Sequence, residues 1–164
     1  MAKKVLIIST SLRGGSNSDI LARECEKGAK EAGHEVEYIS LKGKEIKYCI
    51  GCLACQTKGS CVLKDDVAEI MAKVKDAKVI VYATPIYYYE MAGQMKTLLD
   101  WLNALYPSDY AFRDIYMIAT AAEDEESEMK LFVNDLEIPV IWEETRGNRC
   151  TSCIIDDEYH HKVT

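Results

Sequence analysis

Residues 4–18, KVLIISTSLRGGSNS, join an uninterrupted apolar run to a polar loop that contains two glycines. The run at residues 5–8 shows no polar alternation, which is typical of a strand buried on both faces of a parallel sheet. After the loop, Leu21, Cys25 and Ala29 recur at the spacing of one helix face. A strand, a loop and a helix in this order predict the first crossover unit of an α/β domain.

The same alternation of strand and helix continues along the chain. We expect further strands at residues 34–40, 79–83, 115–119 and 140–142, and helices around residues 65–74, 91–102 and 125–135. Alternation of this kind predicts a doubly wound parallel sheet with helices on both faces. The periodicity is lost near residue 143, so we expect a single domain over residues 1–164 with an irregular, atypical C-terminal tail.

Composition narrows the functional classes. The chain has 164 residues and a formal net charge of -7, which argues against a nucleic-acid surface because phosphate neutralisation needs clustered Lys and Arg. No apolar run reaches membrane-spanning length, and no signal-peptide pattern begins the chain, so we expect a cytoplasmic protein with no membrane contact. Seven cysteines in a reducing compartment favour metal or redox work over disulfides.

Three loops follow predicted strands, at residues 9–18, 84–89 and 120–123. Ligands of open α/β sheets bind beyond the carboxyl ends of the strands, which selects these loops before any motif is considered. In the first loop, glycines, serines and Arg13 precede a helix N-terminus, where free N–H groups bind phosphate. The loop has neither a G-K-[ST] nor a G-x-G-x-x-G motif, which leaves a terminal monophosphate. A polar turn with a serine cap is the alternative interpretation.

The second loop carries three consecutive tyrosines, Tyr87, Tyr88 and Tyr89. Three neighbouring rings in a loop cannot all face a core. Aromatic rings and backbone amides beside a cleft suit a planar, hydrogen-bonding cofactor. A surface aromatic cluster or a dimer contact is the alternative.

Four cysteines lie within thirteen residues, at Cys49, Cys52, Cys55 and Cys61. Three ligands at C-x2-C-x2-C spacing with a fourth nearby favour a 4Fe-4S cluster. A zinc-stabilised binding module, with Cys150 and Cys153 as further ligands, is a second interpretation, although structural zinc sites usually combine two distant knuckles. A disulfide formed in air after loss of the cluster is a third.

Residues 10–18, 84–96 and 49–66 together resemble the NADPH-dependent FMN reductase family, including its iron–sulfur flavoprotein branch. The resemblance covers roughly residues 4–135 and implies a flavodoxin-like sheet that holds FMN, with NAD(P)H as co-substrate. Thr10 and Leu12 depart from the Gly and Pro that the family often has. The implied cofactor-binding residues are Ser9, Ser11, Arg13, Ser16, Asn17, Ser18, Thr84, Pro85, Ile86, Tyr87, Tyr88, Tyr89, Thr120, Ala121, Ala122 and Glu123.

The function implied is an FMN-dependent oxidoreductase that passes electrons from NAD(P)H or a protein donor to a small acceptor such as a flavin or quinone. A cluster on the four cysteines would relay single electrons to a redox partner protein. Because the flavin carries the chemistry, we expect no catalytic side chain. A flavodoxin-type electron carrier without its own substrate is the alternative. The family resemblance also implies a homo-oligomer, either a dimer or a tetramer.

Overall fold

A computed structural model describes residues 1–105, 114–122, 140–146 and 149–155. Its strands are β1 (Lys4–Ser9), β2 (Glu35–Ser40), β3 (Val79–Tyr87), β4 (Glu90–Met91), β5 (Asp114–Ala121), β6 (Val140–Arg146) and β7 (Arg149–Ile155). Its helices are α1 (Asn17–Glu31), α2 (Ala54–Lys58), α3 (Val67–Asp76), α4 (Gly93–Asp100) and the 3-10 turn η1 (Trp101–Leu105).

The strands form one sheet in the order β2-β1-β3-β5-β6-β7, with β4 paired to β3. The four neighbouring pairs along the order β2-β1-β3-β5-β6 are parallel, as the alternation of strands and helices predicts. The chain moves from β1 to β2 on one side and then crosses to β3 on the other. The order therefore reverses between β1 and β3, and the loops that leave these two strands border the crevice where open sheets bind ligands.

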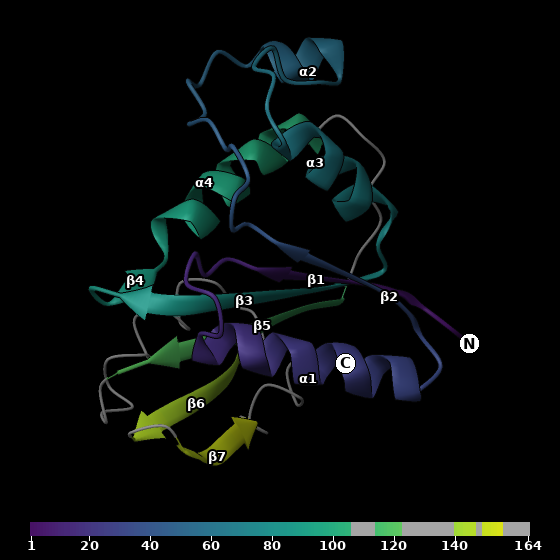
Figure 1. Ribbon diagram of the computed structural model, residues 1–164. Helices are drawn as coiled ribbons and strands as arrows, with labels where there is room; N and C mark the ends of the chain where they lie inside the picture. Colours follow the sequence, from purple (N-terminus) through teal and green to yellow (C-terminus); the bar gives the residue numbers. More distant parts are fainter. Residues whose placement is uncertain (106–113, 123–139, 147–148, 156–164) are drawn as a thin grey trace.

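Helices cover both faces of the sheet (Figure 1). Helix α1 lies on one face, and α3 and α4 lie on the other. Val5 and Ile7 pack in the cluster under α1, whereas Leu6 and Ile8 pack in the cluster under α3 and α4. Because successive side chains of a strand point to opposite faces, an apolar run without alternation is what a strand covered on both sides requires.

The predicted helix faces agree with the burial. The predicted face of α3 is buried at Val67, Ile70, Met71 and Val74. Met95 and Leu98 of α4 are completely buried in the same core cluster. Leu21 and Cys25 of α1 pack against the opposite cluster. The helix expected at residues 125–135 lies outside the described residues. No helix in the part of the chain that the structure describes is both long and apolar enough to cross a membrane.

Three sequence-based expectations need correction. The tail is not irregular from residue 143, because β6 continues to Arg146 and residues 149–155 form β7, antiparallel to β6. A strand at the edge of a sheet needs no apolar periodicity, since its pairing comes from the neighbouring strand. The segment 84–89 is also not wholly a loop. Strand β3 extends to Tyr87, and a tight turn connects it to β4. The third expected loop likewise begins within a strand, because β5 continues to Ala121.

Candidate functional site

The loop between β1 and α1 makes a sharp turn into the helix. Gly15 has a φ of 65°, in the left-handed region that glycine adopts without steric penalty. Ser16 is the N-cap of α1, with an extended backbone and a side chain that accepts a hydrogen bond from the Asp19 N–H at 3.2 Å. The serine cap and the glycines that the sequence indicates therefore fix where the helix begins.

The base of this loop is attached to both neighbouring elements. Thr10 donates its N–H to the Ala83 carbonyl at 2.8 Å and its hydroxyl to the same oxygen at 3.1 Å. The Gln94 side chain, at the start of α4, donates to the Thr10 carbonyl at 2.6 Å. Thr10 is completely buried. The loop is thus connected to β3 and α4, which carry the second predicted binding segment.

The open side of the loop presents hydrogen-bond donors. The N–H groups of Gly14, Gly15 and Ser16 have no acceptor among the described residues. The N–H groups of Asn17 and Ser18, in the first turn of α1, are also free because the helix has no carbonyl four residues before them. These donors add to the positive end of the α1 dipole, so the geometry suits an anion.

Side chains complete the donor set. The hydroxyls of Ser16 and Ser18 are buried and 3.3 Å apart. Ser11 is buried, and its hydroxyl lies 3.3 Å from the Arg13 N–H, which donates to it. Arg13 itself is exposed. Lys42 brings a second cation, since a methyl group added at Gly14 would lie 2.9 Å from its Nζ.

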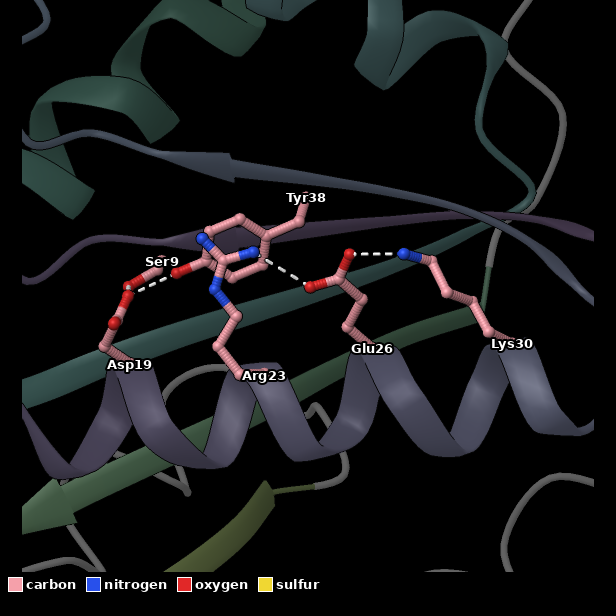
Figure 2. Close-up of polar contacts among 6 residues, drawn as sticks. All are labelled: Ser9, Asp19, Arg23, Glu26, Lys30 and Tyr38. Atoms are coloured by element: carbon pink, nitrogen blue, oxygen red, sulfur yellow. Dashed lines mark hydrogen bonds and ion pairs between the residues drawn. The ribbon is translucent and has the colours of Figure 1, made fainter. Parts of the chain in front are cut away.

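A polar network connects the first turn of α1 to β1 and β2 (Figure 2). One carboxylate oxygen of Asp19 accepts from the Ser9 hydroxyl at 3.0 Å and from the Tyr38 hydroxyl. Burial, together with the hydrogen bond to Asp19, raises the pKa of Tyr38. The Arg23 guanidinium lies 3.3 Å from the centroid of the Tyr38 ring. The network joins β1, α1 and β2, so Ser9, which the sequence places with the cofactor, has its hydroxyl engaged by Asp19.

Four residues near the loop were missed by the sequence reasoning: Lys42, Asp19, Tyr38 and Gln94. Lys42 follows the carboxyl end of β2, which pairs with β1, so the same strand-end rule could have selected it. The other three act through partners distant in sequence, and no local pattern marks them.

The tyrosine turn connects β3 to β4. Tyr87 pairs with Glu90, which leaves Tyr88 and Tyr89 as a two-residue turn with φ values of 53° and 65°. A left-handed backbone costs a non-glycine residue about 1–2 kcal/mol, so the turn is strained at both positions. All three tyrosines are more than half exposed, and Tyr88 is 94% exposed. Strain and exposed rings together are features of a binding segment rather than of a packing segment.

The residues before the tyrosines are held in place by burial and by hydrogen bonds of the Thr84 hydroxyl. Thr84 and Pro85 are buried, and Ile86 is half-buried. The Thr84 hydroxyl donates to the Pro85 carbonyl at 3.0 Å and accepts from the Ala92 N–H at 3.2 Å. These bonds fix the two ends of the hairpin to each other.

The third predicted loop lies beside the second. Thr120 is the register partner of Pro85 across β5 and β3, and its side chain is buried. Ala121 is half-buried and Ala122 is exposed, whereas Glu123 lies outside the described residues. The structure therefore brings the described parts of all three loops to one edge of the sheet.

The cysteine-bearing segment extends beyond α3, with α2 at its outer end (Figure 1). Cys49 and Cys52 are exposed, while Cys55 and Cys61 are half-buried. Within the described ranges, no three His, Cys, Asp or Glu side chains converge on a point that would hold a single metal ion.

The donor set does fit an iron–sulfur cluster, which takes one thiolate at each iron and spreads its ligands more widely than a single ion. The Gly51 N–H donates to the Cys49 sulfur at 3.5 Å. Left-handed backbone at Gly51, Leu53 and Gly59 lets the segment turn repeatedly between its thiols.

Comparison with known proteins places these features in a family. Residues 3–144 match the model of the family described as NADPH-dependent FMN reductase. An iron–sulfur flavoprotein of Methanocaldococcus jannaschii is 42% identical over 97 residues, which cover 59% of this chain and 50% of the relative. An NAD(P)H-dependent FMN reductase of Pseudomonas aeruginosa is 30% identical over 104 residues, covering 61% of this chain and 50% of the relative. The chain thus spans about half the length of these curated relatives.

A solved structure supports the fold independently. The NAD(P)H:quinone oxidoreductase of Methanothermobacter marburgensis superposes with a TM-score of 0.69 over 90% of this chain and 87% of that one, at 13% sequence identity. At that identity the likeness concerns the fold alone. It confirms the doubly wound flavodoxin-like sheet expected from the sequence.

Proposed function

This chain belongs to the NADPH-dependent FMN reductase family, and on that premise we propose that it binds FMN and passes electrons from NAD(P)H or a protein donor to a small acceptor. A free flavin or a quinone is the proposed class of acceptor. The observation that carries the proposal is the set of free N–H groups and buried hydroxyls at the N-terminus of α1, at the reversal of strand order.

The phosphate of FMN is assigned to the loop after β1. Backbone N–H groups of residues 14–18 and the hydroxyls of Ser16 and Ser18 would donate to its oxygens. Arg13 and Lys42 would balance its charge from the exposed side. Asp19 opposes a phosphate by its own charge. Its contribution is positional, since it connects the loop to β1 and β2 through three hydrogen bonds.

The ring system is assigned to the segment after Pro85. Backbone groups at Ile86 and Tyr87 would hydrogen-bond its polar edge, and the tyrosine rings would cover one face and exclude water. Thr120 and the two alanines after it would border the ring, and Glu123, outside the described residues, is proposed as a further contact. FMN supplies the redox chemistry when it is bound, so the chain's task is to bind, orient and shield it.

Cys49, Cys52, Cys55 and Cys61 would hold a 4Fe-4S cluster, which supplies single-electron transfer between the flavin and an outside partner. Support comes from the donor set and from relatives named iron–sulfur flavoproteins. The exposed Tyr87, Tyr88 and Tyr89 also favour a homo-oligomer, a dimer or tetramer, in which a second copy covers the rings.

The test combines an optical spectrum with a turnover assay. Protein purified without oxygen should show flavin absorption in the blue, and it should oxidise NADPH or NADH when FMN, a quinone or a dye is supplied. Bound flavin without nicotinamide oxidation would favour the alternative, a flavodoxin-type carrier that receives electrons from a protein. A chain that takes up no FMN would overturn the proposal.

A further inference from the structure

The cysteine loop, defined as residues 48–63, begins and ends at neighbouring points of the backbone. The Glu45 N–H donates to an Asp66 carboxylate oxygen at 2.8 Å, and the Asp66 N–H donates to the Glu45 carbonyl at 3.1 Å. Lys47 Nζ donates to the Lys64 carbonyl at 2.8 Å. These bonds join the segment that enters the loop to the segment that leaves it.

Asp65 makes the most direct of these connections. One carboxylate oxygen accepts from the Lys47 N–H at 2.7 Å, on the entering segment, and the other accepts from the Val67 N–H at 2.9 Å, in the first turn of α3. Val67 is completely buried. A single carboxylate therefore attaches the entrance of the loop to a helix that belongs to the core.

A third element fixes the same point. Trp101 donates its Nε1–H to the Lys47 carbonyl at 2.7 Å and is only 3% exposed. It begins the 3-10 turn directly after α4, the helix that follows the tyrosine hairpin. Toward its tip the loop lies close to η1 through α2, but several of its side chains face solvent. Tyr48 and Ile50 are 80% and 67% exposed, and Cys52 is exposed.

We propose that Asp65 is a positioning residue that keeps the cysteine loop closed while no cluster is present. The inference rests on the cluster assigned under the proposed function. Closing the ends of a flexible loop has an entropic cost. The hydrogen bonds at the base offset this cost before any cluster binds. The cysteines then have only to reorient, on a loop whose ends already meet, when iron and sulfide bind.

The experiment compares the wild type with Asp65→Asn and with a matched control, Asp100→Asn. An asparagine has one acceptor oxygen and one NH2 donor, so Asp65→Asn serves only one of the two N–H groups and turns a donor toward the other. Asp100 pairs with Lys96 on the surface of α4 at 2.5 Å, and among the described residues no hydrogen bond or ion pair joins its carboxylate to the loop base. Amide hydrogen exchange is measured on cluster-free protein, and iron loss to a chelator is measured after anaerobic reconstitution.

In Asp65→Asn we expect exchange at the loop base and iron loss to be roughly 10-fold faster than in the wild type, a typical effect of changing a group that supports metal ligands. FMN content should stay the same, and Asp100→Asn should match the wild type in all three measurements. Wild-type rates in Asp65→Asn would overturn the inference.

Two further outcomes are also decisive. If Asp65→Asn does not fold, the wild type decides alone: in cluster-free protein, the Lys47 and Val67 amides must exchange far more slowly than those at the tip, such as Cys52. Equal rates at base and tip would overturn the inference. If the wild type takes up no iron, the cluster proposal fails, and the exchange data alone judge whether Asp65 closes the loop.

Discussion

The proposed phosphate loop, residues 9–18, and the cysteine loop follow two neighbouring strands, β1 and β2, yet they are built in opposite ways. In the phosphate loop, Thr10, Ser16 and Ser18 are buried and hydrogen-bonded, and the backbone N–H groups of residues 14–18 have no acceptor among the described residues. In the cysteine loop, the base is hydrogen-bonded and the thiols of Cys49 and Cys52 are exposed. Backbone N–H donors are positioned as soon as the chain folds. Exposed cysteine side chains, in contrast, take their final positions only when a cluster binds.

The largest expected effect is loss of the cluster without loss of FMN, which would show that the two loops bind their ligands independently. Cys52→Ala removes one of four thiolates, so a chain that carries about four irons in the wild type should lose its cluster. Its FMN content should not change, because none of the hydrogen bonds of the phosphate loop involves the cysteine loop. Iron, sulfide and flavin analysis of protein purified without oxygen provides the measurement. Coupled loss of iron and FMN would show that the loops are not independent.

The next effect concerns the exposed cation of the phosphate loop. Arg13→Ala should weaken FMN binding by about 1.5–3 kcal/mol, the usual cost of losing a hydrogen bond to a charged group. Riboflavin, which lacks the phosphate, should bind the variant and the wild type alike. Fluorescence titration with both ligands measures the difference. Equal weakening for FMN and riboflavin would place the phosphate elsewhere.

A smaller effect is expected at the strained turn. Tyr88→Gly relieves a left-handed backbone, worth about 1–2 kcal/mol, but adds the flexibility of glycine to the unfolded chain, a loss of about 0.5–1 kcal/mol. The variant should therefore be slightly more stable than the wild type in denaturant titrations. It should also bind FMN more weakly, since a ring is lost. A variant that is less stable and binds FMN normally would make Tyr88 a structural residue.

The smallest effect lies at the far end of α1. Hydrogen bonding to Lys30, and then to Arg23, lowers the pKa of Glu26. A lowered pKa contributes stability above the ordinary pKa of the group and loses it as the pH falls through the folded value. Glu26→Gln should therefore cost roughly 0.3–0.5 kcal/mol at neutral pH, and the difference should vanish in acid. Unfolding measured across pH tests this, with unchanged FMN affinity as the control.

Local patterns were sufficient for the doubly wound sheet and for the start of α1. The uninterrupted run at residues 5–8 predicted a strand covered on both faces, and Val5 and Leu6 are indeed buried on opposite sides. The serine and glycines of the first loop predicted a helix start with free donors. Both features depend on residues close together in the chain, which is what a sequence pattern records.

What escaped prediction depends on distant partners. Asp19 and Tyr38 contact each other across 19 positions, and Trp101 reaches Lys47 across 54. Strand β7 carries no period of its own and is defined by its pairing with β6. Tyr88 and Tyr89 occupy a turn type that favours Asn and Gly, so residue preference pointed away from the hairpin.

The closed base of the cysteine loop also bears on how such a chain can evolve. Because Glu45 and Asp66 are hydrogen-bonded neighbours, the residues between them form an insert whose ends already meet. Lengthening such an insert is inexpensive, since each doubling adds only about 0.6 kcal/mol of closure entropy. Mutation can therefore lengthen or shorten the exposed part of this insert, whereas its base, with Cys61 and Leu63 packed on the core, has to be kept.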